Sequence, residues 1–180
     1  KMTQEETKMG RVENKIQKNL LAAEKTPGVE DIQPVVAYTG DRGMTLVEFA
    51  PYGIVAAVTP STNPTSTIIN NAISIMSAGN AVIFGPHPAS KKCSQEAVRI
   101  IHEAAVGAGA PAGIISTVEP PSVEATQALL KHPKIKMNLV TGGPAIVRIA
   151  MSAGKKTIAA GPGNPPVVVD ETAVFPKCAF

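Results

Sequence analysis

Residues 52–65 read Tyr-Gly-Ile-Val-Ala-Ala-Val-Thr-Pro-Ser-Thr-Asn-Pro-Thr, and this stretch decides the fold. Its first half, 54–58, is an apolar run rich in β-branched residues, which predicts a strand buried on both faces. Thr59-Pro60 ends the run, and Asn63-Pro64 is typical of the start of a helix. The apolar positions that follow predict a buried helix: Ile68, Ile69, Ala72, Ile73 and Met76. In an open α/β sheet, ligands bind in loops like the one between this strand and this helix.

The same pattern of strand, loop and helix recurs along the chain. Further strands are expected over 81–84, 114–118 and 136–140, with extended segments over 157–160 and 166–169. Ser90 and Ser122 are predicted to cap the second and third helices, Pro144 to begin the fourth, and Gly79 and Gly154 to end the first and fourth. Because parallel strands need right-handed crossovers, this alternation predicts a three-layer α/β fold with a doubly wound parallel sheet.

The first 44 residues follow a different pattern. Residues 3–25 are predicted to form one helix with a thin apolar stripe: Met9, Val12, Ile16, Leu20 and Ala23. Residues 28–44 contain several glycines and a proline and are expected to form an irregular arm, followed by a strand over 45–49. We therefore divide the chain into an N-terminal helix and arm (1–44), a domain of alternating strands and helices (45–173) and a tail of uncertain origin (174–180).

The composition excludes several classes of protein. The chain has 180 residues, 44% of them hydrophobic, but only 3% aromatic residues and no Trp, which suits a parallel sheet under helices. A net charge of +3 from scattered Lys and Arg residues makes nucleic acid an improbable partner. No apolar run reaches the ~18 residues of a membrane span, and no signal peptide precedes the first helix. Cys93 and Cys178 form no CxxC pair, so a reducing cytoplasm is expected.

Three loops are expected to meet at one edge of the sheet: 59–63, 85–88 and 141–144. Neither GxGxxG nor the GxxxxGK[ST] motif is present, so a dinucleotide would not bind through the usual Gly-rich turn. The ordinary explanation of each glycine is backbone geometry. The candidate cofactor contacts in these loops are Thr59, Pro60, Ser61, His87, Pro88, Thr141, Gly142 and Gly143.

The other chemically active residues leave alternatives open. His87, His102 and His132 lack the spacing of metal ligands, and only His87 lies in a predicted ligand loop, so no metal is expected. Asn63 is either the N-cap of a helix or an amide donor to a developing oxyanion. Cys93 lies on the apolar stripe of a helix and is expected to be buried and a poor nucleophile.

The motifs together resemble the aldehyde dehydrogenase superfamily, and more closely its CoA-acylating branch of ethanolamine and propanediol breakdown. The resemblance covers about residues 8–173. It is carried by Ala23-Glu24-Lys25-Thr26-Pro27-Gly28-Val29-Glu30-Asp31, Thr45-Leu46-Val47-Glu48, Thr59-Pro60-Ser61-Thr62-Asn63-Pro64, Pro86-His87-Pro88, Val140-Thr141-Gly142-Gly143 and Ala160-Gly161-Pro162-Gly163-Asn164-Pro165-Pro166.

The resemblance implies that residues 45–173 form a variant Rossmann domain that binds NAD or NADP, and coenzyme A. In the family, an aldehyde forms a thiohemiacetal with a cysteine, hydride passes to the nicotinamide, and coenzyme A takes the acyl group. Hydrolytic members carry a Glu, as base for water, where this chain has Ala159, and its loss suits attack by a thiol. They also carry a Lys for the adenosine ribose where Gly85 stands here, so the cofactor contacts are expected to differ.

The family's nucleophilic cysteine lies beyond the segment that matches 170–173, so the resemblance places it outside this chain, and neither Cys93 nor Cys178 takes its role. The chain is therefore expected to be the cofactor-binding fragment of a CoA-acylating aldehyde dehydrogenase. The alternatives are a stand-alone nucleotide- or CoA-binding module and a structural piece that serves assembly, and the length of the natural reading frame would separate them. The expected partners are a small aldehyde and CoA, in a homo-oligomer located in the cytoplasm or within a bacterial microcompartment.

Overall fold

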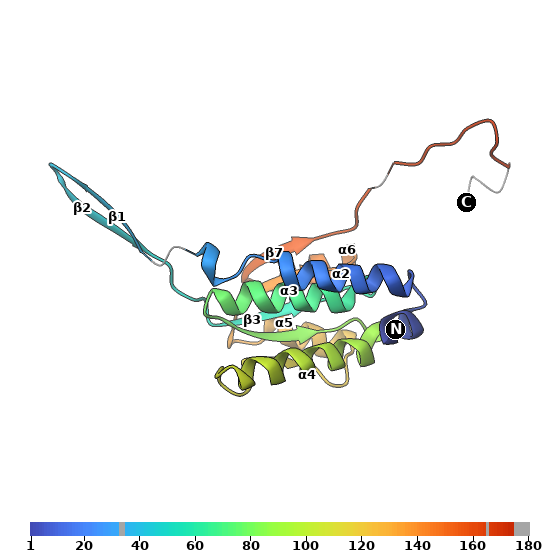
Figure 1. Cartoon of the computed structure of the whole chain (residues 1–180), viewed down its shortest axis with the longest axis horizontal. Coiled ribbons are helices and arrows are strands. Elements are labelled where there is room, and N and C mark those ends of the chain that lie inside the picture. Colours follow the sequence, from blue (N-terminus) through green and yellow to red (C-terminus); the bar gives the residue numbers. More distant parts are fainter. Residues whose placement is uncertain (33–34, 165, 175–180) are drawn as a thin grey trace.

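A computed structural model describes the protein over residues 1–32, 35–164 and 166–174. A parallel five-stranded sheet with strand order β5-β4-β3-β6-β7 lies at its centre. The strands are β3 (Ile54–Val58), β4 (Ala81–Gly85), β5 (Ile115–Thr117), β6 (Ile135–Thr141) and β7 (Lys156–Ala160). Helices cover both faces (Figure 1): α3 (Pro64–Ser77) and α4 (Lys91–Gly107) lie on one face, and α5 (Val123–Lys131) and α6 (Pro144–Met151) on the other. The predicted three-layer, doubly wound sheet is confirmed.

Strand β3 is the centre of the sheet and contributes to both cores. Val55 and Ala57 point to the α3/α4 face, where they join Phe84 and Ile68 in one buried cluster. Ala56 and Val58 belong to the opposite cluster, with residues of α5 and α6. The prediction that 54–58 is buried on both faces is confirmed, and burial of each large aliphatic side chain contributes about 1.5–3 kcal/mol.

The predicted helix ends in the sheet domain are mostly confirmed. Gly79 follows the end of α3 with φ +72°, the left-handed conformation that favours glycine. Ser122 caps α5, because its Oγ accepts a hydrogen bond from the N–H of Ala125 at 3.1 Å. Pro144 begins α6, as expected for a proline at the first helical position.

The N-terminal segment contains two helices, so the prediction of one helix over 3–25 is wrong. Helix α1 (Met2–Thr7) ends at Lys8, which has φ 57°, and α2 (Val12–Lys25) begins after Gly10 with φ +72°. These two left-handed positions, with only Met9 between them, turn the chain. As a result, α1 packs against α4 while α2 packs against α3. The local apolar spacing continued through this turn and did not reveal it.

Helix α2 packs its polar side against α3. Asn19 Oδ1 accepts a hydrogen bond from Thr65 Oγ1 at 3.0 Å, and Asn70 Nδ2 donates to Thr26 Oγ1 at 2.8 Å. Ile16 and Leu20 of the predicted apolar stripe remain 52% and 53% exposed. The apolar stripe correctly predicted a helix. However, the hydroxyl and amide groups of α3 bond to polar side chains, so α2 packs through its polar face and not through the stripe.

The predicted cap of α4 is wrong, because Glu6 of α1 takes that role. The Oγ of Ser90 donates to the carbonyl of His87 at 3.2 Å and caps nothing. The Glu6 carboxylate accepts hydrogen bonds from the N–H groups of Lys92 at 2.9 Å and Cys93 at 2.8 Å. Burial raises the pKa of Glu6, but these two hydrogen bonds outweigh it and leave the pKa below its ordinary value.

Replacing Glu6 with glutamine is expected to lower the free energy of unfolding by about 0.5–2 kcal/mol at pH 7, as for loss of a charged helix cap. A carboxyl whose pKa is lowered by folding stabilises the protein above its unfolded pKa, so this contribution is lost as the pH falls through the folded pKa. Urea unfolding of the unmodified protein and of Glu6→Gln, at pH 7 and at pH 3, measures this contribution to the free energy of unfolding. The exposed Glu5→Gln is the control, and a Glu6→Gln deficit that persists unchanged at pH 3 would contradict the charge-based explanation.

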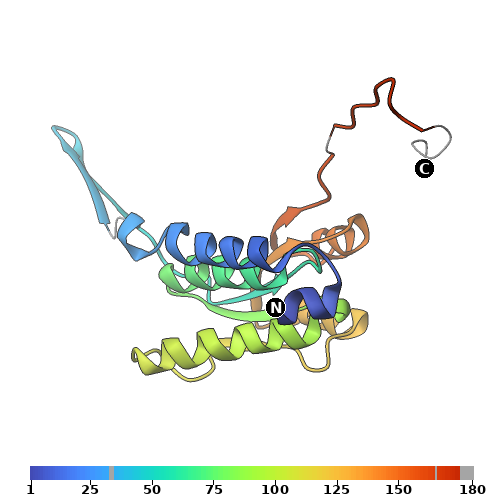
Figure 2. The same cartoon turned by 45° about the vertical axis from the view of Figure 1, so that its right-hand side comes forward.

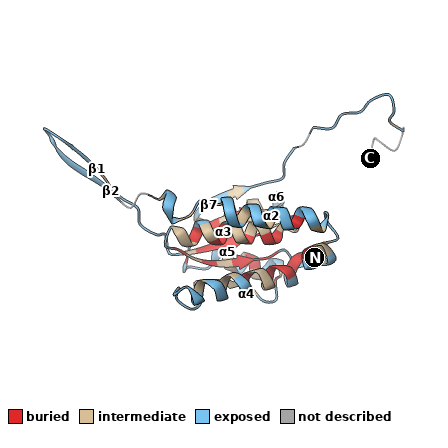
Figure 3. Cartoon of the chain, viewed as in Figure 1, coloured by how far each residue is buried: buried red, intermediate tan, exposed pale blue. Residues whose placement is uncertain are grey.

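The segment 28–44 is more ordered than predicted. It contains a 3-10 turn at Val29–Asp31 and the strand β1 (Val35–Gly40), which pairs antiparallel with β2 (Gly43–Glu48). The strand expected over 45–49 is present as β2, and the division that we predicted at residue 44 falls inside this hairpin. The hairpin projects away from the sheet (Figure 1) and its side chains are almost all exposed (Figure 3).

The chain leaves the sheet after β7 and runs outward (Figure 2). The predicted extended segment 166–169 forms no strand within the described residues, and Val167 and Val168 are 83% and 91% exposed. Of the predicted tail, residues 175–180 lie outside the described residues, and Cys178 is among them.

Candidate functional site

A cavity of about 310 Å³ lies at the carboxyl ends of β3, β4 and β6. The loops after these three strands surround it, and α5 and α6 close its side. This is the edge of an open parallel sheet at which ligands bind, and the three loops meet there as the sequence predicted.

The cavity collects most of the predicted contact residues. Those that line it are Thr59, Pro60, His87, Pro88, Thr141, Gly142 and Gly143. Ser61 and Asn63 do not line it, and Asn63 lies instead in a groove between α2 and α3 beside Lys18.

The sequence analysis missed the helical wall of the cavity. Ser122, Val123 and Thr126 contribute from α5 and its cap, and Ile146 and Ile149 from α6. The spacing of Ile146 and Ile149 was a visible signal, because residues three apart share one face of a helix. It could not show that this face borders a cavity.

Thr59 lines the cavity and carries a buried, unpaired hydroxyl. The residue is 1% exposed, and its Oγ1 has no hydrogen-bond partner in the part of the chain that the structure describes. Its backbone N–H donates to the carbonyl of Gly85 at 3.3 Å, which holds the first loop against the second. Buried polar groups in folded proteins are nearly always hydrogen-bonded, so this hydroxyl is an unsatisfied buried group beside the cavity.

His87 is held in one orientation at the rim of the cavity. Its Nδ1 accepts a hydrogen bond from the N–H of Ala89 at 3.1 Å. Its carbonyl accepts from the N–H of Ser90 at 2.9 Å and from the Ser90 hydroxyl. The hydrogen bond at Nδ1 leaves Nε2 as the ring nitrogen without a hydrogen bond to any described residue.

Gly142 is required for space and not for a left-handed backbone, because it is absent from the positions with positive φ. A Cβ at Gly142 would lie 2.7 Å from Cγ2 of Ile146, too close for real atoms. The N–H of Gly142 donates to the carbonyl of Ala160 at 3.2 Å. A Cβ at Gly143 would meet nothing within 4 Å, so the two adjacent glycines differ sharply in what surrounds them.

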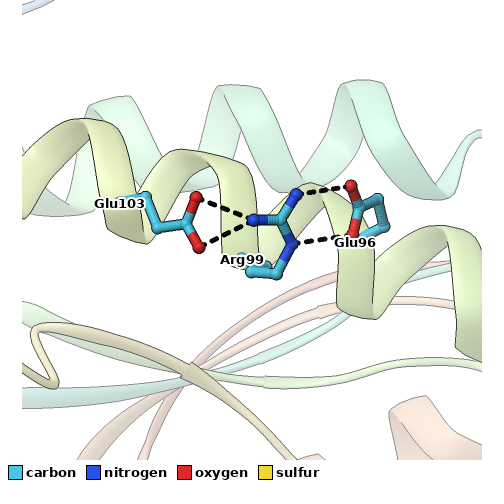
Figure 4. A network of polar contacts seen from close by, with 3 residues as sticks. All are labelled: Glu96, Arg99 and Glu103. Atoms are coloured by element: carbon cyan, nitrogen blue, oxygen red, sulfur yellow. Dashed lines mark hydrogen bonds and ion pairs between the residues drawn. The ribbon is translucent and has the colours of Figure 1, made fainter.

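No charged side chain lines the cavity among the described residues. The strongest cation–anion network lies elsewhere, on the outer face of α4 (Figure 4). Arg99 donates to Glu96 at 2.7 and 2.9 Å and to both oxygens of Glu103 at 2.7 Å, which raises the pKa of the guanidinium. Both carboxylates occupy this arginine, so it is not available to an anionic ligand.

Asn63 occupies the N-cap position of α3, but its side chain does not cap the helix. Its Oδ1 accepts a hydrogen bond from Lys18 Nζ at 3.1 Å, and Lys15 Nζ lies 3.5 Å from the same atom. Of the two alternatives for Asn63, a side-chain cap is therefore absent, although the helix begins where expected. The two lysines, which the sequence analysis did not connect with Asn63, attract its oxygen.

Cys93 is unsuited to act as a nucleophile, as predicted. It is 2% exposed, and burial raises the pKa of its thiol to about 11, assisted by the neighbouring Glu6 carboxylate. At neutral pH the group is therefore a thiol, whereas the thiolate is the reactive form.

His102 and His132 each accept a backbone hydrogen bond, from Gly113 at 3.1 Å and from Lys134 at 3.3 Å. Over the described ranges, no three His, Cys, Asp or Glu side chains are grouped as metal ligands would be. None of the helices in those ranges combines the length and the apolar character needed to cross a membrane.

The chain is similar to known proteins over nearly its whole length. It is 55% identical over 175 residues to acetaldehyde dehydrogenase (acetylating) EutE of Salmonella typhimurium. The matched region is 97% of this chain and 37% of the relative. The structure of Rhodopseudomonas palustris propionaldehyde dehydrogenase with bound propionyl-CoA superposes with a TM-score of 0.88 at 53% identity, over 94% of this chain and 37% of that one. An engineered glycolyl-CoA reductase with bound NADP+ gives a TM-score of 0.88 at 52% identity, over 99% of this chain and 40% of that one.

The chain thus spans about 37% of the length of this curated relative. The family model that matches describes the aldehyde dehydrogenase family, and it matches residues 2–178. This range contains the sheet, all three loops of the cavity and both helices of its wall. The chain belongs to the aldehyde dehydrogenase family.

Proposed function

We propose that this chain is the nucleotide-binding part of an NAD(P)-dependent, CoA-acylating aldehyde dehydrogenase that oxidises a small aldehyde. The observation that carries the proposal is the cavity at the carboxyl ends of β3, β4 and β6, which the three predicted loops surround. The relatives named above support the activity, since they are a CoA-acylating dehydrogenase and enzymes solved with propionyl-CoA and NADP+.

The residues of the cavity fit a nicotinamide dinucleotide. The apolar wall of Val123 and Ile146 suits an adenine ring, and the imidazole of His87 offers a hydrogen bond to its ribose. In the Gly142-Gly143 turn at the start of α6, the N–H of Gly142 is bonded to Ala160, and the N–H of Gly143 is the donor that we propose for a phosphate. When bound, the dinucleotide supplies the acceptor for the hydride that leaves the substrate.

The surroundings of Ala159 favour a thiol as the final acyl acceptor. Ala159 lies on β7 opposite Val140 and packs against the buried cluster on the α5/α6 face. A methyl group at this place cannot remove a proton from water, so hydrolysis has no base there. Coenzyme A, whose thiol is a strong nucleophile, is the acceptor that we propose.

Asn63 keeps its proposed role as an oxyanion donor. The lysines contact only its Oδ1, and its Nδ2 donates no hydrogen bond to any described residue. The nucleophile that would create the oxyanion is proposed to belong to the part of the enzyme that the chain does not span.

We also propose that the enzyme is a homo-oligomer, located in the cytoplasm or in a bacterial microcompartment. The projecting hairpin supports assembly, because it exposes Tyr38, Met44 and Leu46 by 63%, 65% and 59%. Large exposed apolar side chains on one ribbon are typical of a contact surface between proteins. The location follows from the sequence resemblance to enzymes of ethanolamine and propanediol breakdown.

The chain alone is expected to bind NADH without any turnover of aldehyde. Titration of NADH against the chain, followed by NADH fluorescence and thermal shift, should saturate, and CoA should be titrated by calorimetry. An assay with propionaldehyde, CoA and NAD+ should show no NADH formation, because the thiol of Cys93 is buried and protonated.

Absence of heat and of thermal shift at millimolar nucleotide would contradict the binding site. Turnover that survives Cys93→Ala but is abolished by Cys178→Ala would contradict the expected inactivity, and would assign the nucleophile to Cys178. Binding of nucleotide by the chain, in a natural reading frame that ends near codon 180, would favour the stand-alone binding module.

A further inference from the structure

The two lysines beside Asn63 are placed to set the direction of its side chain. Lys15 and Lys18 share one face of α2, which lies along α3 (Figure 1). The Nζ of Lys18 donates to Oδ1 of Asn63 at 3.1 Å, and the Nζ of Lys15 lies 3.5 Å from the same atom. We propose that Lys15 and Lys18 are positioning residues, which hold Oδ1 of Asn63 and so direct its Nδ2 toward the developing oxyanion. This inference rests on the activity and on the role of Asn63 proposed above.

The contacts of the lysines permit only one orientation of the amide. An ammonium group has only donors, whereas an asparagine amide has an acceptor oxygen on one side and a donor NH2 group on the other. The flipped amide would turn its NH2 group toward both cations, so Oδ1 must face them. Nδ2 is then on the far side of the amide, where it donates to no described residue. The cations also polarise the amide, which makes Nδ2–H a stronger donor to a negative charge.

Lys15 is held more firmly than an ordinary surface lysine. It is 8% exposed, and its stem lies against Gly10, where an added Cβ would be 3.2 Å from Lys15 Cε. Its Nζ also donates to the carbonyl of Thr62, the residue before Asn63. Burial and the nearby charge of Lys18 lower the pKa of Lys15, so bringing the two cations to one oxygen has an electrostatic cost. One lysine thus contacts both the amide of Asn63 and the backbone that leads to it.

The first turn of α3 fixes the backbone of Asn63 independently of the lysines. The carbonyl of Asn63 accepts hydrogen bonds from the N–H of Thr67 at 3.2 Å and from the Thr67 hydroxyl at 2.7 Å. Pro64 further restricts the backbone of the residue before it. Because α3 holds the backbone and α2 holds the side chain, the amide has little freedom to turn.

The stability of α3 does not explain the two lysines. The N-terminus of a helix carries a partial positive charge, so cations beside it are unfavourable. Lys15 and Lys18 lie at this end of α3, where Asn63 is the N-cap residue. Lys18 is exposed, and exposed polar contacts of lysine add little to stability. Their effect on the amide of Asn63 accounts for the position of both cations.

The test is a double-mutant cycle in the complete enzyme, which carries the nucleophile. Asn63→Ala should lower kcat/KM for propionaldehyde by about 10²–10³-fold, as for loss of an oxyanion donor. Lys18→Met should lower it at least about fivefold when Asn63 is present, but should change it by less than about twofold in the Asn63→Ala background, because the lysine acts through the amide. KM for NAD+ should stay within about twofold throughout.

Lys25→Met is the matched control for the loss of charge. Lys25 is on the same helix and lines the same groove as Asn63, but it makes no hydrogen bond to Asn63 in the part of the chain that the structure describes. This variant should leave kcat/KM for propionaldehyde within about twofold of the unmodified enzyme, since the charge it removes does not contact the amide.

A spectroscopic measurement on the chain itself reports the contact without turnover. In the chain labelled with ¹⁵N-asparagine, the side-chain amide resonance of Asn63 is identified by its absence in Asn63→Ala. It should shift in Lys15→Met and in Lys18→Met, and stay in place in Lys25→Met. Lys18→Met should unfold at no lower urea concentration than the unmodified chain, because it removes a cation from the positive end of α3. The exposed Lys18 therefore tests the contact even if Lys15→Met does not fold.

The outcomes separate this inference from the function on which it rests. An equal loss of kcat/KM for Lys18→Met with and without Asn63 would overturn it, as would no loss at all. An Asn63 resonance that ignores both lysines would also overturn it. If the complete enzyme forms no acyl-CoA from small aldehydes, although the Asn63 resonance responds to the lysines, the proposed function itself fails, and this inference with it.

Discussion

Replacing Gly142 with valine is expected to weaken NADH binding at least about tenfold, or about 1.4 kcal/mol, while most of the protein remains folded. The added Cβ would lie 2.7 Å from Cγ2 of Ile146, a side chain that lines the cavity. Either Ile146 moves into the cavity or the turn moves away from it, and the two valine methyls also block the approach of a phosphate to the turn. Overpacking of this kind costs about 1–3 kcal/mol of stability.

Gly143→Ala is the matched control. It adds a methyl one residue later, where nothing lies within 4 Å and the backbone has φ −67°. Its NADH affinity should stay within about twofold of the unmodified chain, because the alanine fits both the space and the backbone. If Gly142→Val instead unfolds at a much lower urea concentration, yet its folded fraction binds NADH normally, the glycine serves packing alone.

Phe84→Ala is expected to cost about 3–5 kcal/mol, the range for removal of a large side chain from a packed core. Phe84 is 0% exposed and joins Val55, Ile68 and Val98 in the cluster on the α3/α4 face. Domains of this size have about 5–15 kcal/mol of stability in total, so the variant should unfold at a far lower urea concentration. NADH binding should weaken too, because Phe84 directly precedes Gly85 of the second cavity loop.

Phe49→Ala is the control, because it makes the same truncation at an exposed position. Phe49 follows the exposed hairpin and is 67% exposed, so the same truncation there should change stability by less than about 0.5 kcal/mol. Urea unfolding followed by far-UV circular dichroism compares the three proteins. A cost below about 1 kcal/mol for Phe84→Ala would show that this cluster does not stabilise the sheet as described.

The elements of the sheet could be predicted because their signals are local. The apolar run 54–58 with Asn63-Pro64 after it, and the serine that precedes α5, each identify a strand, a helix start or a cap within a few residues. The cap of α4 could not be predicted in this way. Glu6 reaches it from 86 positions away in sequence, and Ser90, the residue with the right local pattern, bonds to His87 instead.

The residues of the candidate site also fall into those that local sequence predicts and those that depend on distant partners. Thr59, His87 and Gly142 follow directly from where strands end, and the structure brings their loops together. Asn63 could not be placed from its pattern, because the competing partners, Lys15 and Lys18, belong to α2. The contribution of Ile146 depended on how α6 packs, which periodicity along one helix does not contain.

The projecting hairpin has a practical consequence for following this molecule in solution. The chain has no tryptophan and two tyrosines. Tyr38 lies on the hairpin and Tyr52 in the segment before β3, and they are 63% and 53% exposed. Their emission already reports water in the native state, so intrinsic fluorescence should scarcely change when the sheet unfolds. Because the protein emits so little, the fluorescence of bound NADH can be recorded almost free of protein background.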